Sequence, residues 1–346
     1  MTFTVDGEYI ISGGEELGVW RAKDGKQIAT MAAADVRCLA VSKNGRWIAG
    51  GTFNGHAILW DAKTFEKLFT HKEDDHIIYG VDFSPDSAQL VTASRNLTAT
   101  VWDVAASEKV LNLHHKRPVI AAKFSPQGDR IATATRDSVR VWDSNDGRLL
   151  VDIPVKVTPL FNTGLLWSNS RLFVVSVNKI KVFKASTGST VSEWPVRGSN
   201  SYSCIAIPRH GEFIAYSTYD TLTFWETPTH AQLGQIQHPQ NIYSIARSPD
   251  DQFLAIGGYG KKITINSLSP ITVSLLSHWI MVHLNNFSCS DHFSTGFNHF
   301  VSSTPHIPGT RYSYRRHCPS LLEAQPTRKR GGIIDYSNPR VSGSKS

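Results

Sequence analysis

The sequence is poor in the features that mark secreted or membrane-spanning proteins. Its 346 residues include four cysteines, far apart and without a CxxC pair, so we expect reduced thiols in an intracellular protein. The N-terminus lacks the basic and apolar regions of a signal peptide. The most apolar late segment, residues 271–284, is short and interrupted by serine and histidine, which is too little for a membrane span. We therefore expect a cytoplasmic protein, with the nucleus as the alternative, and no membrane partner.

The chain also lacks the motifs that carry catalysis or bind cofactors. It has no HExxH or GxSxG sequence and no paired carboxylates in a catalytic setting. The glycine-rich stretch 257–262 resembles a phosphate-binding loop, but it lacks the GxxxxGK[ST] spacing and falls in a predicted turn between strands. Cysteine and histidine at 289, 292, 317 and 318 lack the spacing of a zinc site. We expect no enzymatic activity, no cofactor and no metal ion.

The positive net charge is not spread over the whole chain. Residues 277–346 contain eight Lys/Arg against three Asp/Glu, which gives +5 of the total of +7. Residues 1–276 therefore carry only +2 and show no basic face, so nucleic acid is not the expected partner.

An internal repeat organises residues 1–276. Seven similar segments end at positions that are 40, 42, 40, 41, 42 and 41 residues apart. Such a period over seven units indicates a repeat architecture. The positions are Trp20, Trp60, Trp102, Trp142, Phe183, Trp225 and Asn266.

Each unit predicts four short antiparallel strands. Runs of β-branched and aromatic residues alternate with turns rich in Asn, Asp, Gly and Pro, and Asn54-Gly55 is a typical hairpin turn. No window shows a helical period. Because one such unit cannot bury both faces of its sheet, the units must pack against each other, and radial closure leaves only short exposed edges. We predict an all-β fold, a seven-bladed β-propeller of four-stranded antiparallel blades.

These motifs resemble the WD-repeat β-propeller family over roughly residues 1–276. The Trp-Asp ending survives at Trp60-Asp61, Trp102-Asp103 and Trp142-Asp143, and Trp225-Glu226 is close to it. The other units have diverged.

The resemblance implies a buried hydrogen-bond network in each blade. Its members are a His before the first strand, a Ser or Thr on the second, an Asp in the following turn and the Trp on the third. Only one unit keeps the full set, as His115, Thr135, Asp137 and Trp142. A catalytic triad of His115, Asp137 and Thr135 is the competing interpretation. We favour the structural network, because the same residue types recur piecemeal at equivalent positions of other units.

The resemblance also implies a binding face, made of the turns between second and third strands and the loops entering the first strands. Arg, Tyr and Phe are concentrated there, and these residues give large contact areas and directional bonds. The candidate partner-binding residues are Arg37, Phe53, Tyr79, Arg95, Arg136, Tyr202, Tyr219, Tyr243 and Tyr259.

The two ends depart from the repeat. Met1 aligns inside a first strand, and the last outer strand must come from residues 271–276, so no separate closing strand is visible. Either the ring closes by packing alone, or the chain is a fragment of a longer protein. Residues 277–346, rich in His, Ser and Arg, predict an irregular or disordered tail, with a decayed eighth unit as the alternative.

Our interpretation is a non-catalytic scaffold, a monomeric propeller within a complex that binds a protein or peptide on its loop face. The alternative is a sensing module derived from a larger signalling NTPase, as in fungal-type NACHT proteins with WD arrays. A propeller enzyme would need a cluster of acids or metal ligands in the central channel, and the sequence shows none.

Overall fold

The computed structural model describes residues 1–268 except 15, 34, 159–163, 197–203, 208–212 and 259–262. The chain divides into two units, Met1–Ser302 and Ser303–Ser346, and all described residues belong to the first. They form β-strands and no helix, hence no helix that could cross a membrane. The all-β prediction is confirmed, and the predicted tail, residues 277–346, lies outside the described residues.

Consecutive strands pair antiparallel into one sheet per repeat, and we number these blades 1 to 7 in chain order. Blade 1 comprises β1 (Thr2–Phe3), β2 (Tyr9–Ser12), β3 (Leu17–Arg21) and β4 (Gln27–Met31). Blade 2 comprises β5 (Val36–Val41), β6 (Trp47–Thr52), β7 (His56–Asp61) and β8 (Lys67–Lys72). Blade 3 comprises β9 (Ile78–Phe83), β10 (Gln89–Ser94), β11 (Thr98–Asp103) and β12 (Glu108–His114). Blade 4 comprises β13 (Ala121–Phe124), β14 (Arg130–Ala134), β15 (Ser138–Asp143) and β16 (Leu149–Pro154).

The remaining three blades follow the same order. Blade 5 comprises β17 (Leu165–Ser168), β18 (Arg171–Ser176), β19 (Lys179–Lys184) and β20 (Thr190–Pro195). Blade 6 comprises β21 (Ile205–Ala206), β22 (Phe213–Thr218), β23 (Thr221–Glu226) and β24 (Gln232–Gln237). Blade 7 has three described strands, β25 (Ile242–Arg247), β26 (Phe253–Gly258) and β27 (Ile263–Ser267). Its expected outer strand, residues 271–276, lies outside the described residues.

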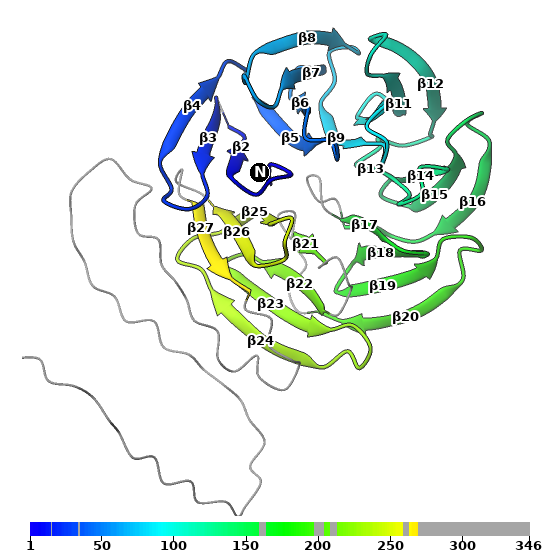
Figure 1. The fold of residues 1–346 in the computed structure, drawn as a ribbon. Helices are drawn as coiled ribbons and strands as arrows, with labels where there is room; N and C mark the ends of the chain where they lie inside the picture. The colour runs from blue at the N-terminus through cyan, green and yellow to red at the C-terminus, as the bar shows by residue number, and fades with distance from the viewer. Residues whose placement is uncertain are drawn as a thin grey trace, which may run out of the picture. The chain divides into compact units, whose positions relative to one another are not determined.

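The blades form a ring, with the first strand of each blade toward the centre and the fourth at the rim (Figure 1). The middle strands are buried on both faces, as in β6 and β10, whereas fourth strands such as β8 are largely exposed. This gradient follows from the ring, because each inner strand lies between two neighbouring blades while the rim meets solvent. The predicted seven-bladed propeller is confirmed.

A buried apolar cluster fills each of the seven junctions between neighbouring blades. The junction of blades 3 and 4 is typical. Here Trp142 on β15 packs with Val91 on β10 and Val101 on β11, and all three are at most 7% exposed. The repeated tryptophans thus bury their rings between blades, which explains why the sequence keeps an aromatic residue once per unit.

A β-bulge accompanies the aromatic position in blades 1 to 6. Pairing between the third and fourth strands shifts by one residue at Trp20, Trp60, Trp102, Trp142, Phe183 and Trp225. The extra residue lies on the outer strand and is apolar, as with Leu68 and Val110. Bulges increase local twist and bend the strand, so this feature curves the rim.

Blade 1 closes the ring against blade 7 by packing. Phe3 and Ile10 of blade 1 share a buried cluster with Ala255 and Ile265 of blade 7. The Met1 amino group also donates a hydrogen bond to Ser244 Oγ on β25 (3.4 Å). Among the described residues, the closure therefore rests on side-chain packing and not on a shared sheet.

Truncation of this closing cluster should destabilise the fold. Ile10 is fully buried, so Ile10→Ala should lower the free energy of unfolding by about 2–4 kcal/mol through lost burial and the cavity left behind. Urea denaturation measures the change. The control is Val5→Ala, because Val5 is 42% exposed and its truncation should change stability by less than ~0.5 kcal/mol. Equal effects of the two substitutions would contradict closure by this cluster.

Candidate functional site

The chain path places two sets of connections on one side of the ring. Successive strands of a blade run in opposite directions, so the turn after the second strand and the loop after the fourth emerge together. Backbone hydrogen bonds join the two sets, for example from His115 N to Leu97 O (2.9 Å) and from Val155 N to Asp137 O (3.2 Å). We call this side the turn face. Its second-to-third-strand turns are residues 53–55, 95–97, 135–137, 177–178 and 219–220.

The predicted partner-binding residues fall into three groups. The exposed residues are Arg37, Phe53, Arg95, Arg136 and Tyr219. Two tyrosines on first strands, Tyr79 and Tyr243, are half-buried, and Tyr202 and Tyr259 lie outside the described residues. Arg37 places its guanidinium carbon 5.1 Å from the ring centroid of Phe53, which is a cation–π contact at the surface.

The predicted network of His115, Thr135, Asp137 and Trp142 is arranged differently from the expected chain of bonds. Trp142 Nε1 donates to Thr133 Oγ1 (2.8 Å), not to Thr135. Thr135 Oγ1 accepts from the backbone N–H of Ser138 (3.2 Å). The four residues surround one blade edge, but the hydrogen bonds divide them into a buried pair and a turn.

A common register explains the partner of Trp142. Trp142 pairs across the strands with Ile131, and Thr133 lies two residues further along the same face of β14. Trp20 donates to Ser12 Oγ (2.9 Å) and Trp102 to Thr92 Oγ1 (3.2 Å) in the same relation. Blade 2 has Gly50 at this position, where an added Cβ would stand 2.9 Å from the Trp60 ring. Trp60 Nε1 accordingly has no partner among the described residues.

One position after each fourth strand links a blade to the next one. Its backbone N–H bonds to the second-to-third-strand turn of its own blade, while its side chain reaches the following blade. We call it the junction position, and it is occupied by Glu73, His115, Val155, Val196 and His238. The two valines join apolar clusters with blades 5 and 6, whereas the other three residues place polar groups in the same setting.

The two junction histidines differ in their hydrogen bonds. His238 Nδ1 lies 2.8 Å from Gln240 O and its Nε2 lies 3.3 Å from Thr264 Oγ1. His115 is 8% exposed, and neither of its ring nitrogens has a partner among the described residues. Its ring instead meets the edge of Trp142, with centroids 5.2 Å apart. Burial, and then the nearby Arg140 and His114 charges, lower the pKa of His115 to about 4, so its imidazole is neutral at pH 7.

Sequence reasoning did not select Glu73, the junction residue of blade 2. Thr92 Oγ1 donates to Glu73 Oε1, and Oε2 is buried without a partner among the described residues. Burial raises the pKa of Glu73 to about 7, although hydrogen bonds from Thr92 and Trp102 act in the opposite direction. Alignment of residues 71–77 with 113–118 would have placed Glu73 opposite His115, but these loops differ in length.

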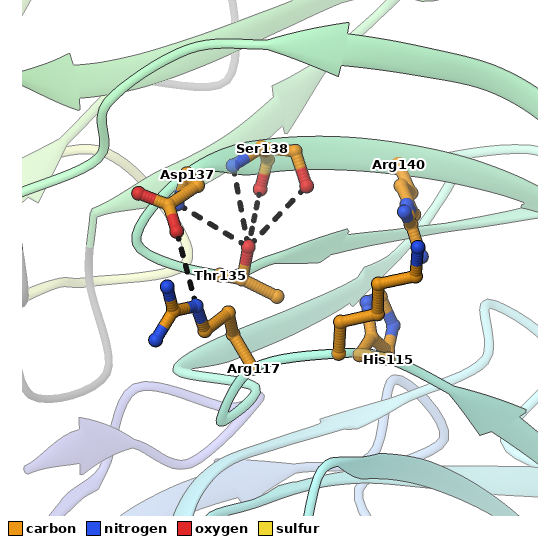
Figure 2. Close-up of a pocket in the computed structure, with 7 residues that line it drawn as sticks. His115, Arg117, Thr135, Asp137, Ser138 and Arg140 are labelled. Atoms are coloured by element: carbon orange, nitrogen blue, oxygen red, sulfur yellow. Dashed lines mark hydrogen bonds and ion pairs between the residues drawn. The ribbon is translucent and has the colours of Figure 1, made fainter.

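A pocket of about 220 Å³ opens beside His115 on the turn face. Its lining comprises His115, Lys116 and Arg117 from the loop after β12, with Thr135, Asp137, Ser138 and Arg140 from the β14–β15 hairpin. Figure 2 shows Arg117 and Asp137 on one side and His115 with Arg140 on the other. Arg117 Nε lies 3.4 Å from Asp137 Oδ2, and both side chains are more than half exposed.

The geometry offers no catalytic arrangement at this pocket. His115, Asp137 and Thr135 form no His–Asp or His–Thr hydrogen bond, because the imidazole nitrogens are unpartnered and Asp137 faces Arg117. Within the described part of the chain, no group of three or more His, Cys, Asp or Glu side chains is placed to hold a metal ion. The arrangement can bind a ligand, but it positions no nucleophile beside a base.

Three segments, residues 25–61, 63–103 and 107–143, match the family described as "WD domain, G-beta repeat". Blades 1 to 7 supply the corresponding fold. The chain belongs to the WD-repeat β-propeller family. It is a diverged member, since the matched segments cover units 1 to 4 only in part and the later units lack the Trp-Asp ending.

Relatives of this WD-repeat propeller are similar over much of its length. The transcriptional corepressor LEUNIG_HOMOLOG of Arabidopsis thaliana is 22% identical over 67% of this chain. The serine-threonine kinase receptor-associated protein of Gallus gallus is 22% identical over 68% of this chain and 67% of its own length. The present chain spans only 35% of the corepressor. These relatives indicate a protein-interaction propeller.

Solved structures with the same fold include proteins of different kinds. A chain in the crystal structure of the mitotic checkpoint complex has a TM-score of 0.69 and 17% identity, covering 77% of this chain and 86% of that chain. A chain of the hydrazine synthase of Kuenenia stuttgartiensis has a TM-score of 0.68 and 15% identity, covering 78% of this chain and 94% of that chain. At these identities the likeness establishes the fold alone.

The buried carboxyl of Glu73 should make stability depend on pH. With a pKa of about 7 in the fold, against 4.5 ordinarily, Glu73 stays protonated in the fold at pH values where the unfolded chain releases the proton. Its stabilising contribution is complete below pH 4.5 and is lost as pH rises through about 7. Glu73→Gln should remove this loss and be more stable than the parent at pH 7.5, by roughly 2–3 kcal/mol.

Urea denaturation at pH 4.5 and pH 7.5 measures the effect. The advantage of Glu73→Gln should appear at the higher pH and shrink at the lower one. Glu66→Gln is the matched control, because Glu66 is exposed in the turn before β8, and it should change stability by less than ~0.5 kcal/mol at both pH values. If the Glu73→Gln variant is less stable than the parent at pH 7.5, the ionised carboxylate is favourable in the fold and the account of Glu73 is wrong.

Proposed function

We propose that the protein is a non-catalytic scaffold that holds a protein or peptide partner on the turn face. The observation that carries this proposal is the exposure of apolar side chains in the turns of this face. Phe53, Leu97, Val177 and Tyr219 are 44%, 40%, 57% and 56% exposed. They come from blades 2, 3, 5 and 6, so they form a distributed set of contacts rather than one chance residue.

Backbone conformation supports a functional origin of two of these residues. Leu97 has φ of 75° and Tyr219 has φ of 46°, in the left-handed region where a side chain with Cβ is strained by about 1–2 kcal/mol. Blade 2 uses Gly55 at the position of Leu97, with the same φ of 75°. Strained positions that retain a large side chain are characteristic of sites selected for binding.

The opposite face of the ring offers fewer free contacts. Its turns between first and second strands satisfy their own polar groups: Ser84 Oγ donates to Asp86 Oδ1 (2.5 Å), and Ser248 Oγ donates to Asp250 Oδ1 (2.5 Å). Neighbouring turns also contact each other, as in the bond from Asn44 N to Ser87 Oγ (3.1 Å). These turns are engaged within the fold, which favours the turn face for a partner.

Other exposed apolar residues have a structural explanation. Leu68, Val110 and Val191 are the extra residues of the outer-strand bulges, and they are 47%, 45% and 46% exposed. They recur once per blade at the rim with the bulge itself. The turn-face residues have no such shared backbone role, and this difference makes the rim residues suitable controls.

Leu97→Gly separates binding from folding, because it removes an exposed contact and relieves the left-handed strain. The variant should unfold at the same free energy as the parent or up to about 1 kcal/mol higher. Affinity capture from cell extract with quantitative mass spectrometry should recover at least tenfold less of the specific partner. Leu68→Gly, a rim substitution of the same type, should leave the recovery unchanged. Full recovery by a stable Leu97→Gly protein would refute the proposed face at this position.

A further inference from the structure

The pocket beside His115 carries an excess of positive charge. Lys116, Arg117 and Arg140 line it together with one carboxylate, Asp137, so three positive charges against one negative leave a net charge of +2 in the lining. Arg117 and Asp137 pair in an exposed position, where ion pairs are weak. Lys116 has no carboxylate partner among the described residues.

Arg140 keeps donors available for a ligand. Its Nε lies 3.1 Å from Asp152 Oδ2 on β16, and this bond uses one of the five N–H groups of a guanidinium. The same side chain faces His115 closely enough for its charge to lower the pKa of that imidazole. Arg140 therefore adds a fixed cation to the pocket, held in place by Asp152 behind it.

The unpartnered imidazole of His115 points to a missing ligand. A neutral imidazole has one N–H donor and one acceptor nitrogen, and a buried polar atom without a partner costs about 1–3 kcal/mol. His238 satisfies both nitrogens at the same junction position, whereas His115, which is 8% exposed and lines the pocket, satisfies neither. A ligand oxygen in this pocket would supply the acceptor that the imidazole N–H lacks.

Two hydroxyl groups complete a polar wall. Thr135 Oγ1 and Ser138 Oγ lie 3.3 Å apart in the β14–β15 hairpin, and both residues line the pocket. Hydroxyl, imidazole, ammonium and guanidinium groups are all hydrogen-bond donors to oxygen, and bonds from the charged donors to an anion are the strongest of them. The wall thus combines donors with net positive charge.

We propose that this pocket binds an oxyanionic side chain of the partner, a phosphorylated residue in preference to a carboxylate. The lining charge of +2 matches the charge of about −1.5 to −2 on a phosphoryl group at pH 7 better than it matches a single carboxylate. The proposal rests on the proposed function, since the pocket lies on the turn face. It adds a chemical requirement to an otherwise unspecified partner.

Binding of small anions tests the pocket without a partner. Isothermal titration of the full chain at fixed ionic strength should show saturable 1:1 binding of inorganic phosphate and of O-phosphoserine, and weaker binding of glutamate. Lys116→Glu should weaken the binding of phosphate at least tenfold. Lys156→Glu is the matched control, because Lys156 is exposed and follows the junction residue Val155 as Lys116 follows His115; it should change the affinity by less than threefold. Absence of saturable binding, or equal losses in both variants, would overturn the proposal.

Capture from cell extract then separates the pocket from the proposed function. If the partner binds through a phosphoryl group, its recovery should fall at least tenfold with Lys116→Glu and after phosphatase treatment of the extract. Loss with Lys116→Glu but not with phosphatase would support an oxyanion site and identify a carboxylate as its ligand. Retention by Lys116→Glu with loss by Leu97→Gly would refute the pocket and leave the scaffold function standing. Retention by both variants would refute both proposals.

Discussion

No blade of this propeller can complete its own core, and the rest of the structure depends on that constraint. A four-stranded sheet of this composition has two apolar faces, and each is buried only by the neighbouring blade. Seven clusters fill the seven junctions, including the one where Ile10 of blade 1 meets Ala255 of blade 7. The middle strands are consequently committed to packing. Variation that serves function is left to the turns, the loops and the rim.

The junction position shows how far this packing tolerates polar groups. Glu73 and His115 occupy the same place in successive blades, and burial moves their pKa values in opposite directions. Stability from Glu73 is lost as pH rises from 4.5 toward about 7, whereas stability from His115 is lost as pH falls from 6.5 toward about 4. Between about 4.5 and 6.5 the two slopes oppose each other. The ring therefore holds two buried ionisable groups with little combined dependence on pH in that range.

The sequence was sufficient for the architecture because the aromatic period reports directly on the junctions. It was less informative about single contacts. Thr133 and Thr135 lie two residues apart on one face of β14, and only the strand register decides that Trp142 bonds to Thr133. Glu73 was missed because a loop of different length hides its equivalence to His115. The exposure and strain of Leu97 also depend on the turn geometry, and a hydrophobic residue in a short turn gives no signal of this in the sequence.

The central claim is that partners bind the turn face while the opposite face and the rim serve the fold. Hydrogen exchange of the full chain, free and bound to a captured partner, tests this most directly. The account predicts that slowed exchange in the complex concentrates in residues 53–55, 95–97, 115–117 and 135–138, with residues 85–88 and 126–129 of the opposite face unchanged. Protection confined to the opposite turns or to the outer strands β8, β12 and β16 would contradict it.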